Sequence, residues 1–445
     1  MRRSKLIRLF LMWVCGLLLL TGIAHADELT IDEAIRMALK NNEAYLSALQ
    51  DKRKAEGQIK EAWAGALPSL TFNGGYTRNF ELQTFVFGGD QIQIGGKNDY
   101  SLRFDLQQTL FGGGRVFNAL AIARLYNKAA SQAVQAARQA LIFNTRNLFY
   151  SAILAHDYVQ VSQDAVERAR ENLDVVTSLY DQGLISEFDR LRAEVELANL
   201  KPQLTKSKNI ASIALSNLRY FIGYESRREV ELNFDFDLVD TITTPELEAA
   251  LDTAFRQRPD YVQQDYLIKA YKKAIGISRS GRMPSLYFSA ALEWAATVDE
   301  TFPGDGDWNR STSASLSLNF PIFDGLESSG KVKQSKADYV KSKLAKSQIE
   351  DAIRLEVEEA ISSIEESKLR LVTSQKTIAL AEEGLRVANL RFKNGIGTQL
   401  EILSAQEALT TARTNHIEAI YDYEIALAKY EKAVGFDRWG KRSRK

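Results

Sequence analysis

An internal repeat constrains the fold of this chain more than any other feature. Residues 111–113 (FGG) match residues 323–325 (FDG) at an offset of 212, and this offset holds over more than a hundred residues. Upstream, residues 68–70 match residues 284–286 at an offset of 216, so the length difference falls between positions 70 and 111. A length change confined to one segment indicates a surface loop. The chain is therefore expected to contain two copies of one structural unit.

Each copy is expected to contain a helix, a pair of strands, a long helix and a shorter return helix. The first repeat covers 27–223 and the second covers 259–435. An equatorial connection is expected over 224–258, and a basic tail over 436–445. The expected strand hairpins, long helices and return helices lie at 69–110, 113–182 and 186–222 in the first repeat, and at 285–322, 325–394 and 398–434 in the second.

The first 26 residues read as a secretory signal peptide. A basic start is followed by an apolar stretch from Leu9 to Leu20, and residues 24–26 (AHA) form an A-x-A cleavage site. A transmembrane anchor is the alternative, but the apolar stretch is shorter than a bilayer span. Cleavage would remove Cys15, the only cysteine of the chain. An exported protein without disulfides must be held together by packing or assembly.

Four segments alternate apolar and polar residues with a period of two. In one of them, Leu102 and Phe104 alternate with Arg103 and Asp105. This period, over about 11 residues, is typical of membrane-spanning β-strands that turn apolar side chains to lipid and polar ones to a wet lumen. The four segments are 69–80, 100–110, 285–296 and 312–322, with long polar turns expected at 81–99 and 297–310.

A β-sandwich with a dry core is the alternative for these strands. The polar faces carry small polar residues that could not fill such a core, and the two hairpins lie far apart in the sequence. On the membrane interpretation, Leu102, Phe104, Leu316 and Leu318 must lie on an outer wall. Four strands cannot close a barrel, because about eight is the practical minimum. Three copies of the chain would supply 12 strands, an even number as in bacterial outer-membrane barrels.

The two long helical segments, 113–182 and 325–394, are 70 residues each and contain no proline. A helix of that length extends roughly 105 Å. A plain coiled coil is the alternative, but small and polar residues interrupt any a/d stripe, as in QSKADYVKSKLAKSQ at 334–348. Such helices can line a water-filled space on one side and face the periplasm on the other.

The turns after the long helices share one pattern of residues. Gly183 and Gly395 can take the left-handed conformation that ends a helix. Ser186 and Thr398 are then expected to cap the next helix, with an acid three residues later as in a capping box. Those acids, Asp189 and Glu401, have a second interpretation: three copies of each could ring the narrow end of a tube, where carboxylates favour cations and can close a pore.

Several segments together resemble the TolC-like outer membrane efflux protein family. They are LTIDEAIRMALKNN (29–42), ALPSLTFNGGY (66–76), TLFGGGR (109–115), NFPIFDGLE (319–327) and the two turns. The resemblance covers essentially the whole mature chain. It implies a mixed α and β membrane protein with the TolC-like fold: four membrane strands per chain, a 12-stranded barrel in a homotrimer, and a long periplasmic α-helical barrel.

The resemblance also implies partners and a location. The chain would lie in the cell outer membrane of a Gram-negative-type envelope, surrounded by outer-membrane lipid and extending into the periplasm. It would be the passive exit duct of a tripartite efflux or type I secretion system, coupled to a periplasmic adaptor and an inner-membrane pump or ABC exporter. The adaptor contact would fall on the turns, at Gly183, Leu184, Ser186, Gly395, Ile396, Gly397 and Thr398.

Asp189 and Glu401 match acidic gate positions of that family, but the chain departs from its pattern nearby. Ser404 stands where a second aspartate is expected, Gly397 where an arginine is expected, and Phe392 where a tyrosine is expected. The sequence therefore does not determine how the duct closes, which cargo it carries or which pump it serves.

Other classes of function find little support in the sequence. Lys plus Arg and Asp plus Glu both number 57, and this balance argues against a nucleic-acid binder. No catalytic triad, HExxH or P-loop motif is present, so no catalytic residue, cofactor site or metal site is expected. His156 and His416 are expected at solvated helix positions. The alternative to an export duct is a structural or adhesive coiled-coil protein that spans the envelope.

Overall fold

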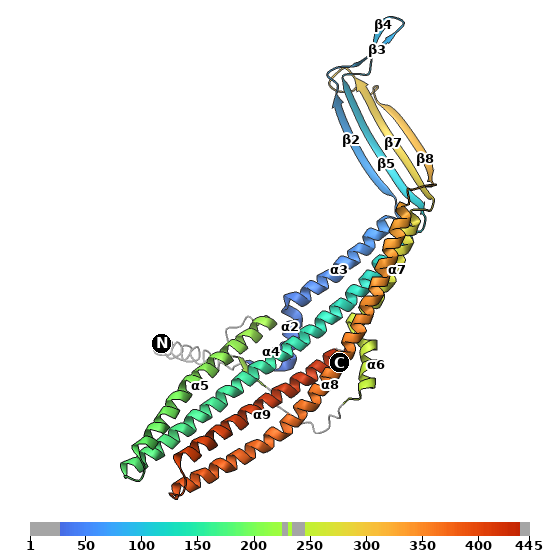
Figure 1. Cartoon of the computed structure of the whole chain (residues 1–445). Coiled ribbons are helices and arrows are strands. Elements are labelled where there is room, and N and C mark those ends of the chain that lie inside the picture. Colours follow the sequence, from blue (N-terminus) through green and yellow to red (C-terminus); the bar gives the residue numbers. More distant parts are fainter. Residues whose placement is uncertain (1–26, 225–229, 234–244, 437–445) are drawn as a thin grey trace, which may run out of the picture. The chain divides into compact units, whose positions relative to one another are not determined.

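The computed structural model describes residues 27–224, 230–233 and 245–436, which form two compact units (Figure 1). Unit 1 comprises the described parts of Met1–Asn42, Ala140–Thr244 and Ala360–Tyr430. Unit 2 comprises those of Glu43–Gln139, Pro245–Glu359 and Glu431–Lys445. Each unit therefore takes segments from both predicted repeats. The expected signal peptide and all but the first residue of the expected tail lie outside the described residues.

Eight helices and eight strands are defined within the described ranges. No helix among these residues is both long and apolar enough to cross a bilayer. The helices are α2 (Ile31–Asn41), α3 (Glu43–Ala64), α4 (Arg115–Asp181), α5 (Glu187–Ile222), α6 (Leu247–Gln257), α7 (Pro259–Ser280), α8 (Glu327–Lys393) and α9 (Gln399–Ala433). The strands are β1 (Asp27–Leu29), β2 (Ser69–Arg78), β3 (Gln83–Phe87), β4 (Asp90–Ile94), β5 (Asn98–Gly112), β6 (Val230–Leu232), β7 (Ser285–Val298) and β8 (Asn309–Asn319).

The two long helices begin two residues later than the sequence predicts. Gly113 and Gly114 precede α4 with φ angles of 60° and 80°, and Gly325 precedes α8 with a φ of 62°. These left-handed conformations are incompatible with a right-handed helix, so the helices start after them.

Unit 2 contains a four-stranded antiparallel sheet in the order β2-β5-β7-β8 (Figure 1). The two predicted hairpins are joined through β5 and β7, where Phe104 pairs with Leu292 and Arg103 with Glu293. Strands β2 and β8 are left at the open edges of this sheet.

The two faces of the sheet separate apolar from polar side chains, as the period of two predicts. On the apolar face, the Phe104 ring lies 4.8 Å from that of Phe72 and 6.3 Å from that of Trp294, measured between centroids. Leu102 and Phe104 are each 39% exposed, and Leu316 and Leu318 are 64% and 71% exposed. These side chains therefore do not fill a dry core within the chain.

The opposite face carries a network of charged and amide groups. Arg103 Nε donates to Asp105 at 2.8 Å, and Arg103 Nη1 donates to Glu293 at 3.2 Å. Asn73 Nδ2 donates to Asp105 at 3.2 Å. Strands β2, β5 and β7 are thus joined by polar contacts on the face that the sequence predicts to be wet.

Two details of the strand prediction are wrong. The segment 81–99 is not a plain turn, because β3 and β4 form their own two-stranded antiparallel sheet there. Gly88 and Gly89, with φ angles of 65° and 101°, permit the tight turn between them. The last strand covers Asn309–Asn319 rather than 312–322, since Pro321 has no N–H group to continue a strand ladder.

The N-terminal part of unit 1 is attached to the end of α5. Thr30 and Glu33 form a capping box that starts α2. At the other end of α2, Asn41 Nδ2 donates to the carbonyl oxygens of Ile222 and Gly223, both at 3.2 Å. Strand β1 pairs in parallel with β6, which lies within the expected equatorial connection.

We predict that Gly223→Ala loosens this attachment. Gly223 has a φ of 66°, and a Cβ atom there would lie 2.6 Å from Asn41 Cβ. The left-handed conformation alone costs an L-residue about 1–2 kcal/mol. Amide hydrogen exchange in α2 should therefore become about tenfold faster. The matched control is Gly57→Ala, because a Cβ at Gly57 meets no atom within 4 Å. Unchanged exchange in α2 of the Gly223 variant would contradict the account.

Candidate functional site

The candidate site of unit 1 consists of the turns that end α4 and α8. At the first turn, Gly183 has a φ of 70°, and its N–H donates to the Tyr180 carbonyl oxygen at 2.8 Å. Leu184 N–H donates to the Leu179 carbonyl oxygen at 2.9 Å, which satisfies a second carbonyl at the helix end. Ser186 Oγ then accepts from Asp189 N–H at 3.3 Å and caps α5.

The second turn has the same backbone pattern. Gly395 has a φ of 72°, and its N–H donates to the Phe392 carbonyl oxygen at 3.0 Å. Ile396 N–H donates to the Arg391 carbonyl oxygen at 3.0 Å. Thr398 Oγ1 accepts from Glu401 N–H at 3.3 Å.

The predicted capping boxes are wrong in one of their two hydrogen bonds. At neither turn does the acidic side chain accept from the backbone N–H of the capping residue. The Asp189 carboxylate accepts from the Ser186 hydroxyl at 2.6 Å. The Glu401 carboxylate instead accepts from Arg391 Nε at 3.1 Å. A guanidinium is a stronger donor to a carboxylate than a neutral backbone amide, which explains why Glu401 turns toward α8. Arg391 also donates to the Ile396 carbonyl oxygen at 3.3 Å, so it fixes the turn itself.

The structure gives a reason for one departure from the family pattern. A Cβ atom at Gly397 would lie 2.8 Å from the Phe392 backbone nitrogen and 2.9 Å from Arg391 Cβ. A larger residue at this position would force the turn to shift. Leu184 and Ile396, at corresponding points of the two turns, are exposed.

A groove of about 640 Å³ lies between α8 and α9 beside the second turn. The Arg391–Glu401 pair lies in its wall, so the groove combines a charged pair with apolar surface. Its lining residues are Gly384, Val387, Ala388, Arg391, Thr398, Leu400, Glu401, Ser404 and Ala405.

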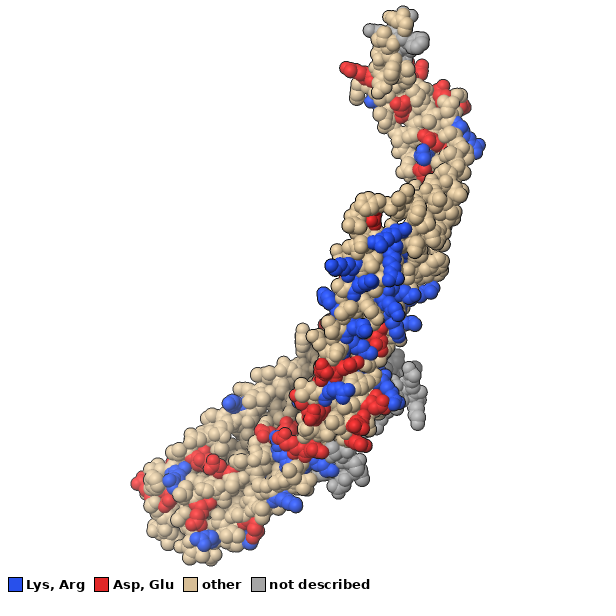
Figure 2. All heavy atoms as spheres, turned by 45° about the vertical axis from the view of Figure 1, so that its right-hand side comes forward, with Lys and Arg blue, Asp and Glu red and all other residues tan. Residues whose placement is uncertain are grey.

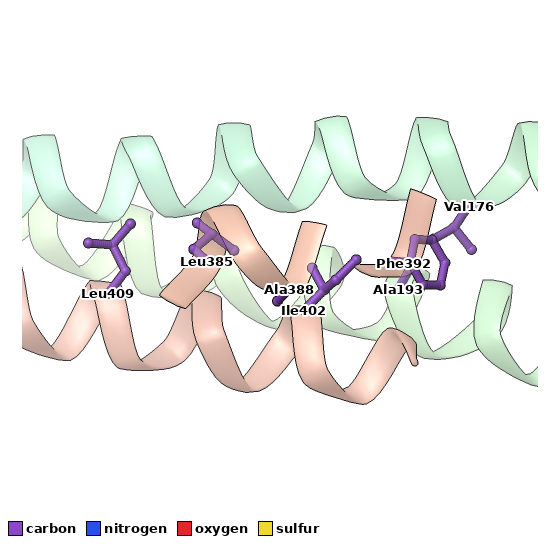
Figure 3. Close-up of a cluster of buried hydrophobic side chains, with 7 residues drawn as sticks. All are labelled: Val176, Ala193, Leu385, Ala388, Phe392, Ile402 and Leu409. Atoms are coloured by element: carbon purple, nitrogen blue, oxygen red, sulfur yellow. The ribbon is translucent and has the colours of Figure 1, made fainter. Parts of the chain in front are cut away.

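Behind the turns, four helices share a cluster of buried apolar side chains (Figure 3). Phe392 belongs to this cluster, so an aromatic ring without a hydroxyl suits its position. Gln399 is 2% exposed, and neither atom of its amide has a hydrogen-bond partner within the described residues. An unsatisfied buried polar group costs about 1–3 kcal/mol. The cluster comprises Val176 of α4, Ala193 of α5, Leu385, Ala388 and Phe392 of α8, and Ile402 and Leu409 of α9.

Polar contacts connect α9 to its neighbours farther from the turns. Arg413 donates to Asp164 of α4 at 2.8 Å and to Glu382 of α8 at 3.1 Å. Arg168 of α4 donates to Thr410 at 3.1 Å, and burial lowers the pKa of its guanidinium. Arg391 and Arg413 could not be singled out from the sequence, because neither belongs to a motif and their carboxylate partners lie on other helices.

His416 does not lie at the solvated helix position that the sequence predicts for it. His156 lies in the exposed position expected of it, whereas His416 is half-buried, with Nδ1 3.0 Å from Ser374 Oγ. Burial lowers the pKa of His416, because the charged imidazolium loses hydration.

We predict that His416 makes the protein less stable as the pH falls. Its pKa is about 6.5 in the unfolded chain and lower in the fold, so protons bind the unfolded state first. Stability is therefore lost as the pH drops below about 6.5. The unfolding midpoint should fall less between pH 7 and pH 5 in His416→Gln than in the wild type. A slope in His416→Gln equal to the wild-type slope would contradict the account.

Comparison with known proteins places this geometry in context. A model of the outer membrane efflux protein family matches residues 34–224 and 250–435. Protein CyaE of Bordetella pertussis is 22% identical over 392 residues, which cover 88% of this chain and 81% of CyaE. Outer membrane protein TolC of Escherichia coli is 23% identical over 322 residues (68% and 62%). The cobalt-zinc-cadmium resistance protein CzcC of Cupriavidus metallidurans is 21% identical over 412 residues (92% and 91%).

Solved structures show the same fold. A membrane protein from Pseudomonas aeruginosa matches with a TM-score of 0.79 and 19% identity, covering 91% of this chain and 93% of that one. The CmeC outer membrane channel of Campylobacter jejuni matches with a TM-score of 0.76 and 19% identity, covering 93% and 88%. The helices and the sheet described above are therefore those of a TolC-like fold.

Proposed function

The chain belongs to the outer membrane efflux protein family, and from this we propose that three copies of it form the exit duct of a tripartite export system. The family establishes an efflux or secretion channel of the outer membrane. The homotrimer, the adaptor, the pump and the gate are proposals.

The open sheet carries the proposal. Among the described residues, no strand pairs with the outer edge of β2 or of β8, and the sheet exposes an apolar face that includes Leu316 and Leu318. Apolar surface favours lipid, but unpaired backbone groups at the sheet edges are costly there, so both edges must be paired. Because the four strands alternate in direction, β8 of one copy can pair antiparallel with β2 of the next. Three copies would close a barrel of 12 strands, with the Arg103–Asp105 face toward water.

The helices of unit 1 also leave apolar surface for other copies. Phe188 and Val195 are exposed on α5, and Leu369, Leu380 and Val387 are exposed on α8. On α8 the spacings of 11 and 7 residues keep these side chains on one side of the helix. Neighbouring copies would cover both stripes and form the periplasmic α-helical barrel.

The two turns would meet the periplasmic adaptor. Leu184 and Ile396 present apolar side chains there, and the groove beside Glu401 could receive a helix of the adaptor. The adaptor would connect the duct to an inner-membrane pump or ABC exporter, which supplies the energy. CzcC is named for cobalt, zinc and cadmium resistance, but the described residues of this chain include no cluster of metal-ligating side chains that would favour a metal as cargo.

Asp189 and Glu401 would form rings of carboxylates at the narrow end. Both lie on the first turn of a helix beside an exposed tip, and three copies would place six carboxylates there. Arg391 offsets part of the charge of Glu401. Arg391 lies in the last turn of α8 and contacts the connecting turn, in which Gly397 stands where the family has an arginine. The polar contact that closes the duct would therefore lie within the helical hairpin of α8 and α9.

We predict that Leu316→Arg prevents assembly in membranes, whereas Ser315→Arg permits it. Leu316 lies on the apolar face, and Ser315 lies on the polar face, where its hydroxyl is 2.8 Å from that of Ser289. An arginine toward the bilayer midplane of a barrel costs about 2–4 kcal/mol. The measurement is the yield of heat-modifiable trimer extracted from outer membranes. Equal yields from the two variants would refute the membrane assignment of the sheet.

We also predict that Glu401→Ala lowers the cation selectivity of purified trimers in planar bilayers. Removing three carboxylates from a ring weakens its attraction for cations. The reversal potential under a salt gradient should shift toward anions, and more strongly at low salt. Gln406→Ala on the same helix is the control, since it changes no charge. Unchanged selectivity would leave Glu401 as a residue that only fixes the turn.

A further inference from the structure

The helices of unit 2 carry a concentration of cations next to the sheet. Figure 2 shows Lys and Arg side chains gathered over this stretch of the helices. The stretch consists of residues 115–139 of α4, residues 266–280 of α7 with the two residues that follow it, and residues 327–346 of α8; we call it the basic band. Its acids are Glu327 and Asp338, and its cations are Arg115, Arg124, Lys128, Arg138, Lys269, Lys272, Lys273, Arg279, Arg282, Lys331, Lys333, Lys336, Lys341, Lys343 and Lys346.

Apart from Arg138, most of these cations form no ion pair with a carboxylate among the described residues. Lys331 pairs with Glu327 at 2.5 Å, and Lys346 pairs with Asp265 at 2.8 Å. By contrast, Lys128 and Lys269 both lie over the ring of Tyr266, with Nζ 5.8 and 5.5 Å from its centroid. Neither has a carboxylate partner among the described residues. Like charges held together destabilise a folded protein, so an anionic partner would lower the free energy of this band.

The band is confined to one stretch. Farther along α8, residues 350–359 hold five acids and a single arginine. In a threefold assembly, symmetry brings the same stretch of each copy together. The positive charges of the three bands would therefore add. This step rests on the proposed trimer.

Helix α8 places lysines on both of its free sides. Ser342 is buried against α7, where Gln264 Nε2 donates to its carbonyl oxygen at 2.8 Å. Residues of a helix advance about 100° each, so Lys341 and Lys343 lie on opposite sides of Ser342. Both lysines are exposed. In a wall one helix thick, one side faces the duct and the other faces outward.

We propose that the basic band makes this segment of the duct a selective region for anions, so that anionic solutes are favoured as cargo. A ring of cations concentrates anions and repels cations in a narrow water-filled passage. The cargo class inferred is small anionic molecules. Salt screens such a field beyond about 10 Å at 0.1 M ionic strength.

The test uses full-length trimers in planar bilayers under a potassium chloride gradient. The variants are Lys341→Glu and Lys343→Glu, two residues apart and on opposite sides of α8. One of them should shift the reversal potential toward cation selectivity, because six units of charge change in the duct of a trimer. The other should leave it near the wild-type value. The shift should shrink in 1 M salt.

Three results would overturn the inference. Channels of normal conductance in which neither variant shifts the potential would show that the band does not act on the duct. Equal shifts from both variants would contradict the placement of the two lysines on opposite sides of a wall. Absence of any channel in the wild-type protein would refute the proposed function, and the inference with it.

Discussion

The unpaired edges of the β2-β5-β7-β8 sheet are the constraint on which the rest of the molecule depends. A sheet with two open edges and one exposed apolar face cannot be stable alone in water or in lipid. The exposed apolar stripes of α5 and α8 likewise require partners that cover them. The proposed duct follows from this single requirement for pairing.

Local patterns in the sequence predicted much of this architecture. The alternation of Leu102 and Phe104 with Arg103 and Asp105 predicted two separate faces, and the structure has them. Gly183 and Gly395 end their helices in the predicted left-handed conformation. Arg391 and Arg413 could not be predicted, because their partners are chosen by packing across a turn or between helices. The hairpin of β3 and β4 was not predicted, because glycines such as Gly88 and Gly89 are typical of loops.

Both units contain ion pairs, but unit 2 also carries lysines that have no carboxylate partner among the described residues. In unit 1, Arg413 and Arg391 join carboxylates on neighbouring helices or across a turn. In unit 2, Lys128 and Lys269 share an aromatic ring without a carboxylate. Paired charges fix the geometry of the helix ends, whereas unpaired charges act on what lies outside the chain.

Cross-linking between the sheet edges tests the central claim most directly. Cys15, in the expected signal peptide, is the only native cysteine, so engineered pairs can be read without interference. One cysteine is scanned along β2 and the other along β8, and membranes are oxidised before denaturing electrophoresis. The account predicts that pairs at one register link neighbouring copies and that the linked species end at three chains. Absence of links at every register, or a ladder that continues past three chains, would contradict it.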